Sequence, residues 1–237
     1  MRAPRAFAAA FLCRGSSSLA VRTSVKMAAG GQRVRFVTNT WCPYAQRTWI
    51  ALEESGTTYD MEEISLYGAG GKPRWFMELN PKGEVPVLVV DGKPIVGSEE
   101  TVDYLMHDEL NPDDRRAISL RWRAIVNDRL KPAGKRAVFS QGSDTDRQSL
   151  AAVLEELEGC LADGPGDDAV GGSGGGGPFV CGAAFTAADA SAFPFLQRIH
   201  GEFGFPTSCK RLEAWYTSAS CRSGVRKTIM KQFWWWW

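Results

Sequence analysis

Cys42 is the residue whose type and setting best suit chemistry. It lies between residues 33–38, which are short, β-branched and aromatic like a strand, and a helix predicted from Pro43 to about residue 54. A sulfur at a helix start lies near backbone N–H groups without helical partners and near the positive end of the helix dipole. Cysteines in such positions have pKa values of about 3.5–7.5 instead of about 8.5. The position predicts a reactive thiolate, with a buried structural cysteine as the alternative.

The dipeptide Val85-Pro86 precedes a predicted strand and is the second candidate. A proline at the start of a strand often marks a bend. A cis bond there would expose the Val85 backbone at a turn, where it could pair with an extended peptide. Most X–Pro bonds are trans, so the residues alone favour an ordinary turn.

The first half of the chain combines strands and helices around these positions. Asp91-Gly92 between two apolar runs predicts a hairpin. Ser98 is predicted to cap the following helix, with Glu99 and Glu100 in its first turn. The whole order is a strand at 33–38, a helix at 43–54, a strand at 58–66, a helix at 73–79, a hairpin at 87–96 and a helix from 98. This order predicts a compact α/β domain with a mixed sheet over residues 32–110.

The second half shows helical patterns alone. We expect an all-α domain over residues 115–233, with helices near 115–130, 147–162, 186–200 and 208–220. Residues 164–177 contain eight glycines, so they are predicted to be a mobile surface loop. Thr186 and Asp189 have the spacing of a capping box.

Composition narrows the class of protein. The chain has 237 residues, is 44% hydrophobic and 23% charged, and has a net charge of +1. These values are typical of a globular protein and give no charge-driven reason to bind nucleic acid. No apolar run is long enough for a membrane span. The six cysteines form no C-x-x-C pair and have no histidines at zinc-finger spacing, so no metal site is expected.

The two ends of the chain are set apart from the predicted fold. Residues 1–27 contain five basic residues and no acid, and they are rich in alanine and serine. This composition is typical of an organellar transit peptide, although synthesis starting at Met27 is an equal alternative. We therefore expect either a cytoplasmic protein or, with a transit peptide, one of the plastid or mitochondrial matrix. The four tryptophans at 234–237 have no physical account.

Three motifs resemble one known family. The segment Trp-Cys-Pro-Tyr-Ala-Gln-Arg at 41–47 resembles the active-site segment of omega and lambda class glutathione transferases. Lys72-Pro73-x-Trp75-Phe76 and residues 80–88, Asn-Pro-x-Gly-x-Val-Pro-Val-Leu, match the omega pattern at the same spacing. Residues 179–196 resemble segments shared by many transferase classes. The resemblance implies the cytosolic transferase architecture, an α/β thioredoxin-like N-terminal domain followed by an all-α C-terminal domain.

The resemblance also implies roles for individual residues. Cys42 would form a mixed disulfide with glutathione, the co-substrate. The remaining roles concern glutathione binding: a cis-Pro86, a Val85 backbone that bonds the cysteinyl unit, Lys72 at a carboxylate, Tyr44 lining the pocket and Ser98 at the γ-glutamyl carboxylate.

The chain departs from the family pattern at one position. Family members carry an acid directly before the serine, where it pairs with the γ-glutamyl ammonium, whereas this chain has Gly97 there. Either Glu99 replaces that acid from a shifted backbone, or the ammonium site is weak.

The expected function is a one-cysteine glutathione-dependent thiol transferase or reductase, acting on protein–glutathione disulfides or dehydroascorbate. Alternatives are conjugation of electrophiles by glutathione activated at Tyr44 or Ser98, and a non-enzymatic relative of the chloride channel proteins or of scaffolding transferase-like domains. The expected partners are glutathione and a disulfide or small-molecule substrate, without stable membrane insertion, in a monomer or homodimer.

Overall fold

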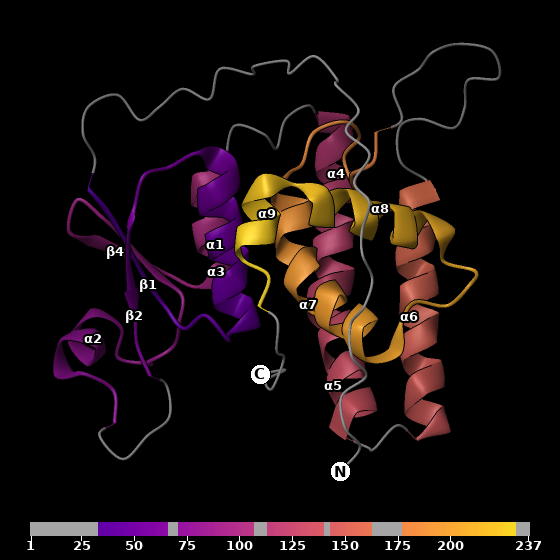
Figure 1. Ribbon diagram of the computed structural model, residues 1–237, viewed down its shortest axis with the longest axis horizontal. Coiled ribbons are helices and arrows are strands. Elements are labelled where there is room, and N and C mark those ends of the chain that lie inside the picture. The colour runs from indigo at the N-terminus through magenta and orange to yellow at the C-terminus, as the bar shows by residue number, and fades with distance from the viewer. Residues whose placement is uncertain (1–32, 66–70, 107–112, 140–142, 163–176, 231–237) are drawn as a thin grey trace.

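A computed structural model describes residues 33–65, 71–106, 113–139, 143–162 and 177–230. The expectations for residues 1–27, for most of the glycine-rich segment 164–177 and for the tail at 234–237 lie outside these residues. The described chain forms an α/β unit followed by a helical unit, as the sequence predicts (Figure 1).

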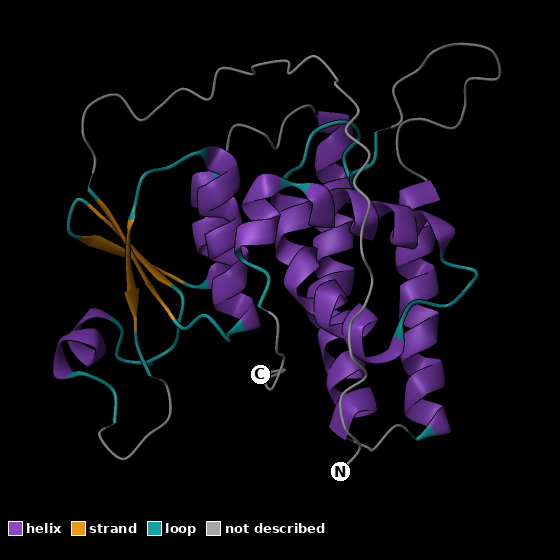
Figure 2. Ribbon diagram, viewed as in Figure 1, coloured by secondary structure: helices purple, strands orange, loops and turns teal. Residues whose placement is uncertain are grey.

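The α/β unit is built on a four-stranded sheet with the strand order β2-β1-β3-β4. Strand β1 runs parallel to β2 and antiparallel to β3, and β3 pairs antiparallel with β4, so the sheet is mixed. Helices α1 and α3 lie on the side of the sheet that faces the helical unit, and α2 lies apart from them beside the sheet (Figures 1 and 2). The elements are β1 (Val34–Thr38), α1 (Pro43–Ser55), β2 (Asp60–Glu63), α2 (Arg74–Leu79), β3 (Val87–Val90), β4 (Lys93–Val96) and α3 (Ser98–Leu105).

The strand register brings three loops to one edge of the sheet. Strand β1 ends at this edge, β3 begins there because it is antiparallel to β1, and β4 ends there because it is antiparallel to β3. The pairs Val37–Val87 and Val87–Val96 fix the alignment. The loops that carry Cys42, Pro86 and Ser98 therefore meet, although they are far apart in the sequence.

The helical unit begins with a longer helical run than the sequence predicts. The expected helix at 115–130 continues to Phe139, with a π-helical segment between two α-helices. Helix α9 was not predicted. The elements are α4 (Asp113–Ala124), η2 (Ile125–Leu130), α5 (Lys131–Phe139), α6 (Asp144–Ala162), α7 (Ala187–Phe203), α8 (Lys210–Cys221) and α9 (Ser223–Lys227).

Helix α1 is buried from two sides. Its residues Ala45 and Leu52 belong to the core of the sheet, whereas Ile50 and Ala51 belong to the core of the helical unit. Helix α7 packs against α1 and is buried from Ala187 to Ile199. The two units therefore share α1 as a common wall.

The predicted capping box at the start of α7 is confirmed. Asp189 is fully buried and accepts hydrogen bonds from the backbone N–H groups of Thr186 at 2.8 Å and Val180 at 3.0 Å. It also accepts from the Thr186 hydroxyl at 3.1 Å and from the indole N–H of Trp215 on α8 at 2.7 Å. One carboxylate thus joins the start of α7 to the preceding loop and to α8.

We predict that Asp189→Asn lowers the free energy of unfolding by about 1.5–3 kcal/mol, because an amide cannot accept all of these bonds. Urea unfolding followed by circular dichroism measures the change. Asp144→Asn is the matched control, since Asp144 is exposed in the first turn of α6. Equal unfolding midpoints for the two variants would contradict this role of Asp189.

Candidate functional site

Cys42 is the N-cap residue of α1, and Pro43 occupies the first helical position, as predicted. The loop before it is fixed by Asn39, whose carbonyl accepts the Cys42 N–H at 2.9 Å and whose side-chain amide donates to the Ile64 carbonyl at 2.9 Å. The thiol is free and partly exposed. The structure therefore places a free cysteine at the start of a helix, at the sheet edge where the loops meet.

The expected lowering of the Cys42 pKa is not found. Burial raises the pKa of the thiol, and the backbone amides of Ala45 and Tyr44 and the guanidinium of Arg198 lower it by less. The backbone hydrogen bonds from these amides do not offset the effect of burial. Desolvation disfavours the charged form, so the free protein holds this sulfur as a thiol at neutral pH.

The Val85–Pro86 bond is cis, as the resemblance implies and contrary to the expectation from the residues alone. Among the described residues, neither the N–H nor the C=O of Val85 has a hydrogen-bond partner. The Pro86 carbonyl accepts the N–H of Gly97 at 3.4 Å, which links this loop to the start of α3. The loop thus offers the two backbone groups that an extended peptide would need.

Lys72 lies over Gly83, two residues before Val85. A Cβ built on Gly83 would lie 2.9 Å from the Lys72 Nζ, and the φ of Gly83 is +63°, a value that few side chains tolerate. Glycine at this position therefore lets the lysine chain approach the backbone closely. The ammonium is brought toward the loop that contains Val85.

Ser98 was predicted to cap α3, but in the structure it does not. Gly97 is the N-cap residue, with a φ of +107°, and Ser98 is the first residue of the helix. The Ser98 hydroxyl is nearly buried and accepts a long hydrogen bond of 3.4 Å from the Arg47 guanidinium. The hydroxyl is therefore oriented by α1, the helix that carries Cys42.

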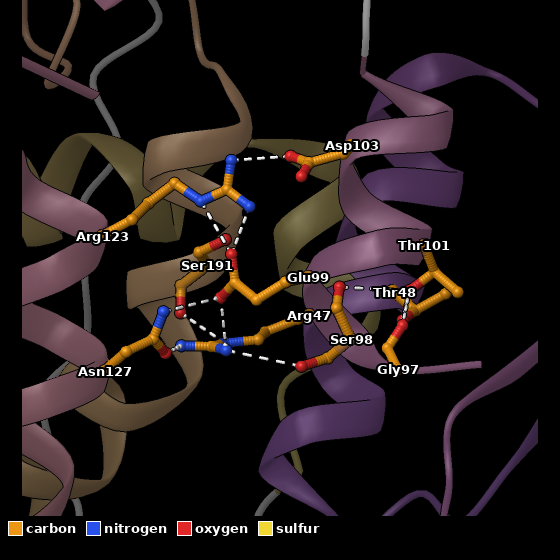
Figure 3. A network of polar contacts seen from close by, with 10 residues as sticks. All are labelled: Arg47, Thr48, Gly97, Ser98, Glu99, Thr101, Asp103, Arg123, Asn127 and Ser191. Carbon is orange, nitrogen blue, oxygen red and sulfur yellow. Dashed lines mark hydrogen bonds and ion pairs between the residues drawn. The ribbon is translucent and has the colours of Figure 1, made fainter. Parts of the chain in front are cut away.

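Glu99 is the centre of an ion-pair cluster between the two units, shown in Figure 3. Its Oε1 accepts from Arg47 at 2.6 Å and from Asn127 at 3.1 Å. Its Oε2 accepts from Arg123. Although burial alone would raise the pKa of Glu99, these two guanidinium groups lower it. We call Arg47, Glu99, Asp103, Arg123 and Asn127 the interdomain clasp.

Arg47 connects this clasp to α7. It is 1% exposed, and its Nε donates to the Ser191 carbonyl at 2.7 Å. Burial lowers the pKa of Arg47 to about 10, and the charge of Glu99 opposes that effect. The clasp partners Arg123 and Asn127 belong to the helical unit, and the sequence analysis missed both because the motif around Cys42 does not indicate which distant residues face it.

Glu100, rather than Glu99, lies beside Gly97. The Glu100 carboxylate occupies the space into which a Cβ on residue 97 would point. Glu100 is exposed, and its carboxylate forms no ion pair within the described chain. The carboxylate beside Gly97 is thus that of Glu100, one residue after Glu99, which the sequence analysis considered for this place.

Tyr44 lies where the two units meet. Its ring makes an edge contact with Phe195 of α7, with 5.3 Å between the centroids, and Lys131 Nζ lies 5.1 Å from its centre. Burial raises the pKa of the Tyr44 hydroxyl, although Arg47 opposes this. The tyrosine is therefore a neutral wall of the site at neutral pH.

Two further features concern the part of the chain that the structure describes. None of its helices is long and apolar enough to cross a membrane. The same residues contain no group of three or more histidine, cysteine or acidic side chains that could hold a metal ion.

Comparison with known proteins relates this geometry to one family. The glutathione S-transferase N-terminal domain matches residues 41–108, and the glutathione S-transferase C-terminal domain matches residues 140–218. Glutathione S-transferase DHAR2 of Arabidopsis thaliana is 29% identical over 163 residues, 69% of this chain and 69% of that protein. Glutathione S-transferase omega-1 of Rattus norvegicus is 38% identical over 84 residues, 35% of this chain and 33% of that protein.

A solved structure agrees with this. Glutathione transferase Omega 3C of Trametes versicolor has a TM-score of 0.67 and 25% identity, covering 86% of this chain and 91% of that one. Its likeness extends over both units, and the two domain matches cover most of the described residues. The chain belongs to the glutathione S-transferase family, with a thioredoxin-like first domain and a helical second domain.

Proposed function

We propose that the protein is a glutathione-dependent thiol transferase of the omega or lambda type, with Cys42 as its nucleophile. The observation that carries the proposal is a partly exposed cysteine at the start of α1, together with a loop in which the N–H and C=O of Val85 have no partner among the described residues. The position three residues after Cys42 is Ala45, so no second cysteine follows on the same helix turn to resolve a disulfide. The relatives of omega and DHAR type agree with this assignment.

The reaction takes place in two exchanges. The Cys42 thiolate attacks the glutathione sulfur of a mixed disulfide, a Cys42–glutathione bond forms, and the substrate leaves as a thiolate that takes up a proton. The thiolate of a second glutathione then attacks the bound glutathione sulfur, so that oxidised glutathione leaves and the Cys42 thiolate is restored. In sum, one free glutathione and the mixed disulfide become the substrate thiol and oxidised glutathione, so one disulfide is exchanged for another.

Bound glutathione would extend along the sheet edge. The open N–H and C=O of Val85, beside Pro86, would pair with the cysteinyl unit, and this places the glutathione sulfur toward Cys42. The Lys72 ammonium would meet one carboxylate, and the Ser98 hydroxyl would donate to the γ-glutamyl carboxylate at the start of α3. Tyr44 would form the wall that faces the helical domain.

The γ-glutamyl ammonium requires an acid, and we propose Glu100 for this role instead of Glu99. Both oxygens of Glu99 are already occupied by the clasp. Glu100 is exposed and lies against Gly97, the position at which the family pattern has its acid.

The substrate and the compartment are finer parts of the proposal. Protein–glutathione disulfides and dehydroascorbate are the proposed oxidised substrates, and glutathione is the co-substrate. A transit peptide within residues 1–27 would direct the protein to plastids or mitochondria, and a start at Met27 would leave it in the cytoplasm.

We predict that Cys42→Ser abolishes glutathione-dependent reduction of a small mixed disulfide, because serine cannot form the intermediate. Whole-protein mass after incubation with oxidised glutathione should show one added glutathione on the wild type and none on the variant. Cys209→Ser is the control, since Cys209 is a free thiol that is buried away from α1. Equal turnover by wild type and Cys42→Ser would remove Cys42 from the mechanism.

We predict that alkylation of Cys42 by iodoacetamide accelerates about tenfold per pH unit from pH 6 upward, without a plateau below about pH 8.5. The reason is that burial raises the Cys42 pKa, so the reactive thiolate is a small fraction at neutral pH. Mass spectrometry of the modified peptide, with Cys42→Ser as the blank, measures the profile. A plateau below pH 7 would show a stabilised thiolate and contradict the burial argument.

We predict that Glu100→Gln weakens binding of S-methylglutathione about two- to tenfold, the range of a partly screened charge pair. Calorimetric titration on a Cys42→Ser background avoids covalent chemistry. Glu78→Gln, an exposed acid in an i,i+4 pair on α2, is the control and should bind normally. Glu99→Gln should mainly lower the unfolding midpoint, so a loss of affinity confined to Glu99→Gln would assign the ammonium to Glu99.

A further inference from the structure

Arg198 is a buried cation that the helical domain directs at the loop carrying the reactive cysteine. It belongs to α7, it is 2% exposed, and its Nη2 donates to the carbonyl of Trp41 at 3.1 Å. That carbonyl belongs to the peptide bond that joins Trp41 to Cys42. An arginine of the second domain thus holds the backbone immediately before the sulfur.

The guanidinium is held in place by two further acceptors. Its Nη1 donates to the carbonyl of Pro194, one turn earlier on α7, at 2.7 Å, and to Gln46 Oε1 on α1 at 2.7 Å. The Gln46 amide is itself oriented, because its Nε2 donates to Gln197 at 3.0 Å and to the Thr228 carbonyl at 3.2 Å. Buried hydrogen bonds therefore link Arg198 to Gln46 of α1, and through Gln46 to Thr228, the residue after α9.

The charge of Arg198 acts on Cys42 and is affected by it in return. Burial lowers the pKa of Arg198 to about 10, and the Cys42 thiolate opposes that change. The Tyr44 hydroxyl on α1 is influenced in turn by Arg47, by Cys42 and by Glu84 of the loop before β3. Arg198 is the charged side chain from the helical domain that lowers the Cys42 pKa.

We propose that Arg198 is a positioning residue for thiol chemistry at Cys42, holding the Trp41–Cys42 peptide and supplying the positive charge that compensates the thiolate. The proposal rests on the proposed function of Cys42. It assigns to the second domain a part in activating the nucleophile, beyond forming the wall of a substrate site. Because the cation is buried and fixed, its field at the sulfur is less screened than that of a surface charge.

The test is the pH profile of Cys42 alkylation in Arg198→Gln and Arg198→Lys. Glutamine can still donate to the Trp41 carbonyl but carries no charge, so its profile should move upward by half a pH unit or more. At pH 7 the alkylation rate of Arg198→Gln should be at most about one third of the wild-type rate. Lysine retains the charge and should recover most of the wild-type profile. Arg129→Gln, an exposed arginine of η2, is the control and should titrate as the wild type.

A folded Arg198→Gln protein with the wild-type profile would overturn the proposal. A second measurement leaves Arg198 in place: in arginine-labelled protein, the Arg198 guanidinium resonances should shift as Cys42 is titrated from pH 7 to 10. Because the Cys42 thiolate raises the Arg198 pKa, the Arg198 titration curve should lie at lower pH in Cys42→Ser. Identical curves for the two proteins would also overturn the proposal. Neither measurement needs glutathione. A failure of the proposed transferase activity would show instead as equal turnover by the wild type and Cys42→Ser, so the two failures can be distinguished.

Discussion

The burial of α1 between the sheet and the helical domain is the constraint on which the site depends. An α-helix covered on both sides must satisfy its polar side chains from within the protein, because leaving them without partners is costly. Arg47 and Gln46 are both buried on α1, and they bond to carbonyl and side-chain groups of α7, η2 and the segment after α9. The helix that starts at Cys42 is therefore held in a fixed direction by the second domain.

The same burial explains the electrostatics of the cysteine. A helix N-terminus lowers a thiol pKa most effectively when its amides reach the sulfur directly and water remains near it. Here residues of α7 contact Trp41 and Gln46 at the start of α1, and burial of the thiol exceeds the favourable effect of the amides and of Arg198. Burial around a functional group thus makes it harder to ionise and also makes each nearby fixed charge more effective.

Local sequence patterns predicted most of the fold but less of the site. The hairpin at Asp91-Gly92, the Pro43 start of α1 and the capping box at Thr186 are each determined by a few adjacent residues, and all are confirmed. The expected helix ended near residue 130, whereas the chain continues through the π-helical segment into α5, with Pro132 in the first turn of α5. The raised pKa of Cys42 and the engagement of Glu99 were not predictable, since both depend on helices more than twenty residues away in the sequence.

A raised pKa does not by itself make Cys42 a poor nucleophile. Thiolate nucleophilicity increases with pKa with a Brønsted coefficient of about 0.4–0.5, so each unit of pKa above the ambient pH lowers the attack rate only about threefold to fourfold, although the thiolate fraction falls tenfold. The second exchange is more sensitive, because the Cys42 sulfur is then the leaving group and a less stable thiolate leaves more slowly. A cation that stabilises the thiolate helps at both stages, since it increases the reactive fraction in the first and the departure rate in the second. Arg198, which holds the Trp41 carbonyl next to Cys42, would serve in both exchanges, whereas the substrate sulfur takes part only in the first.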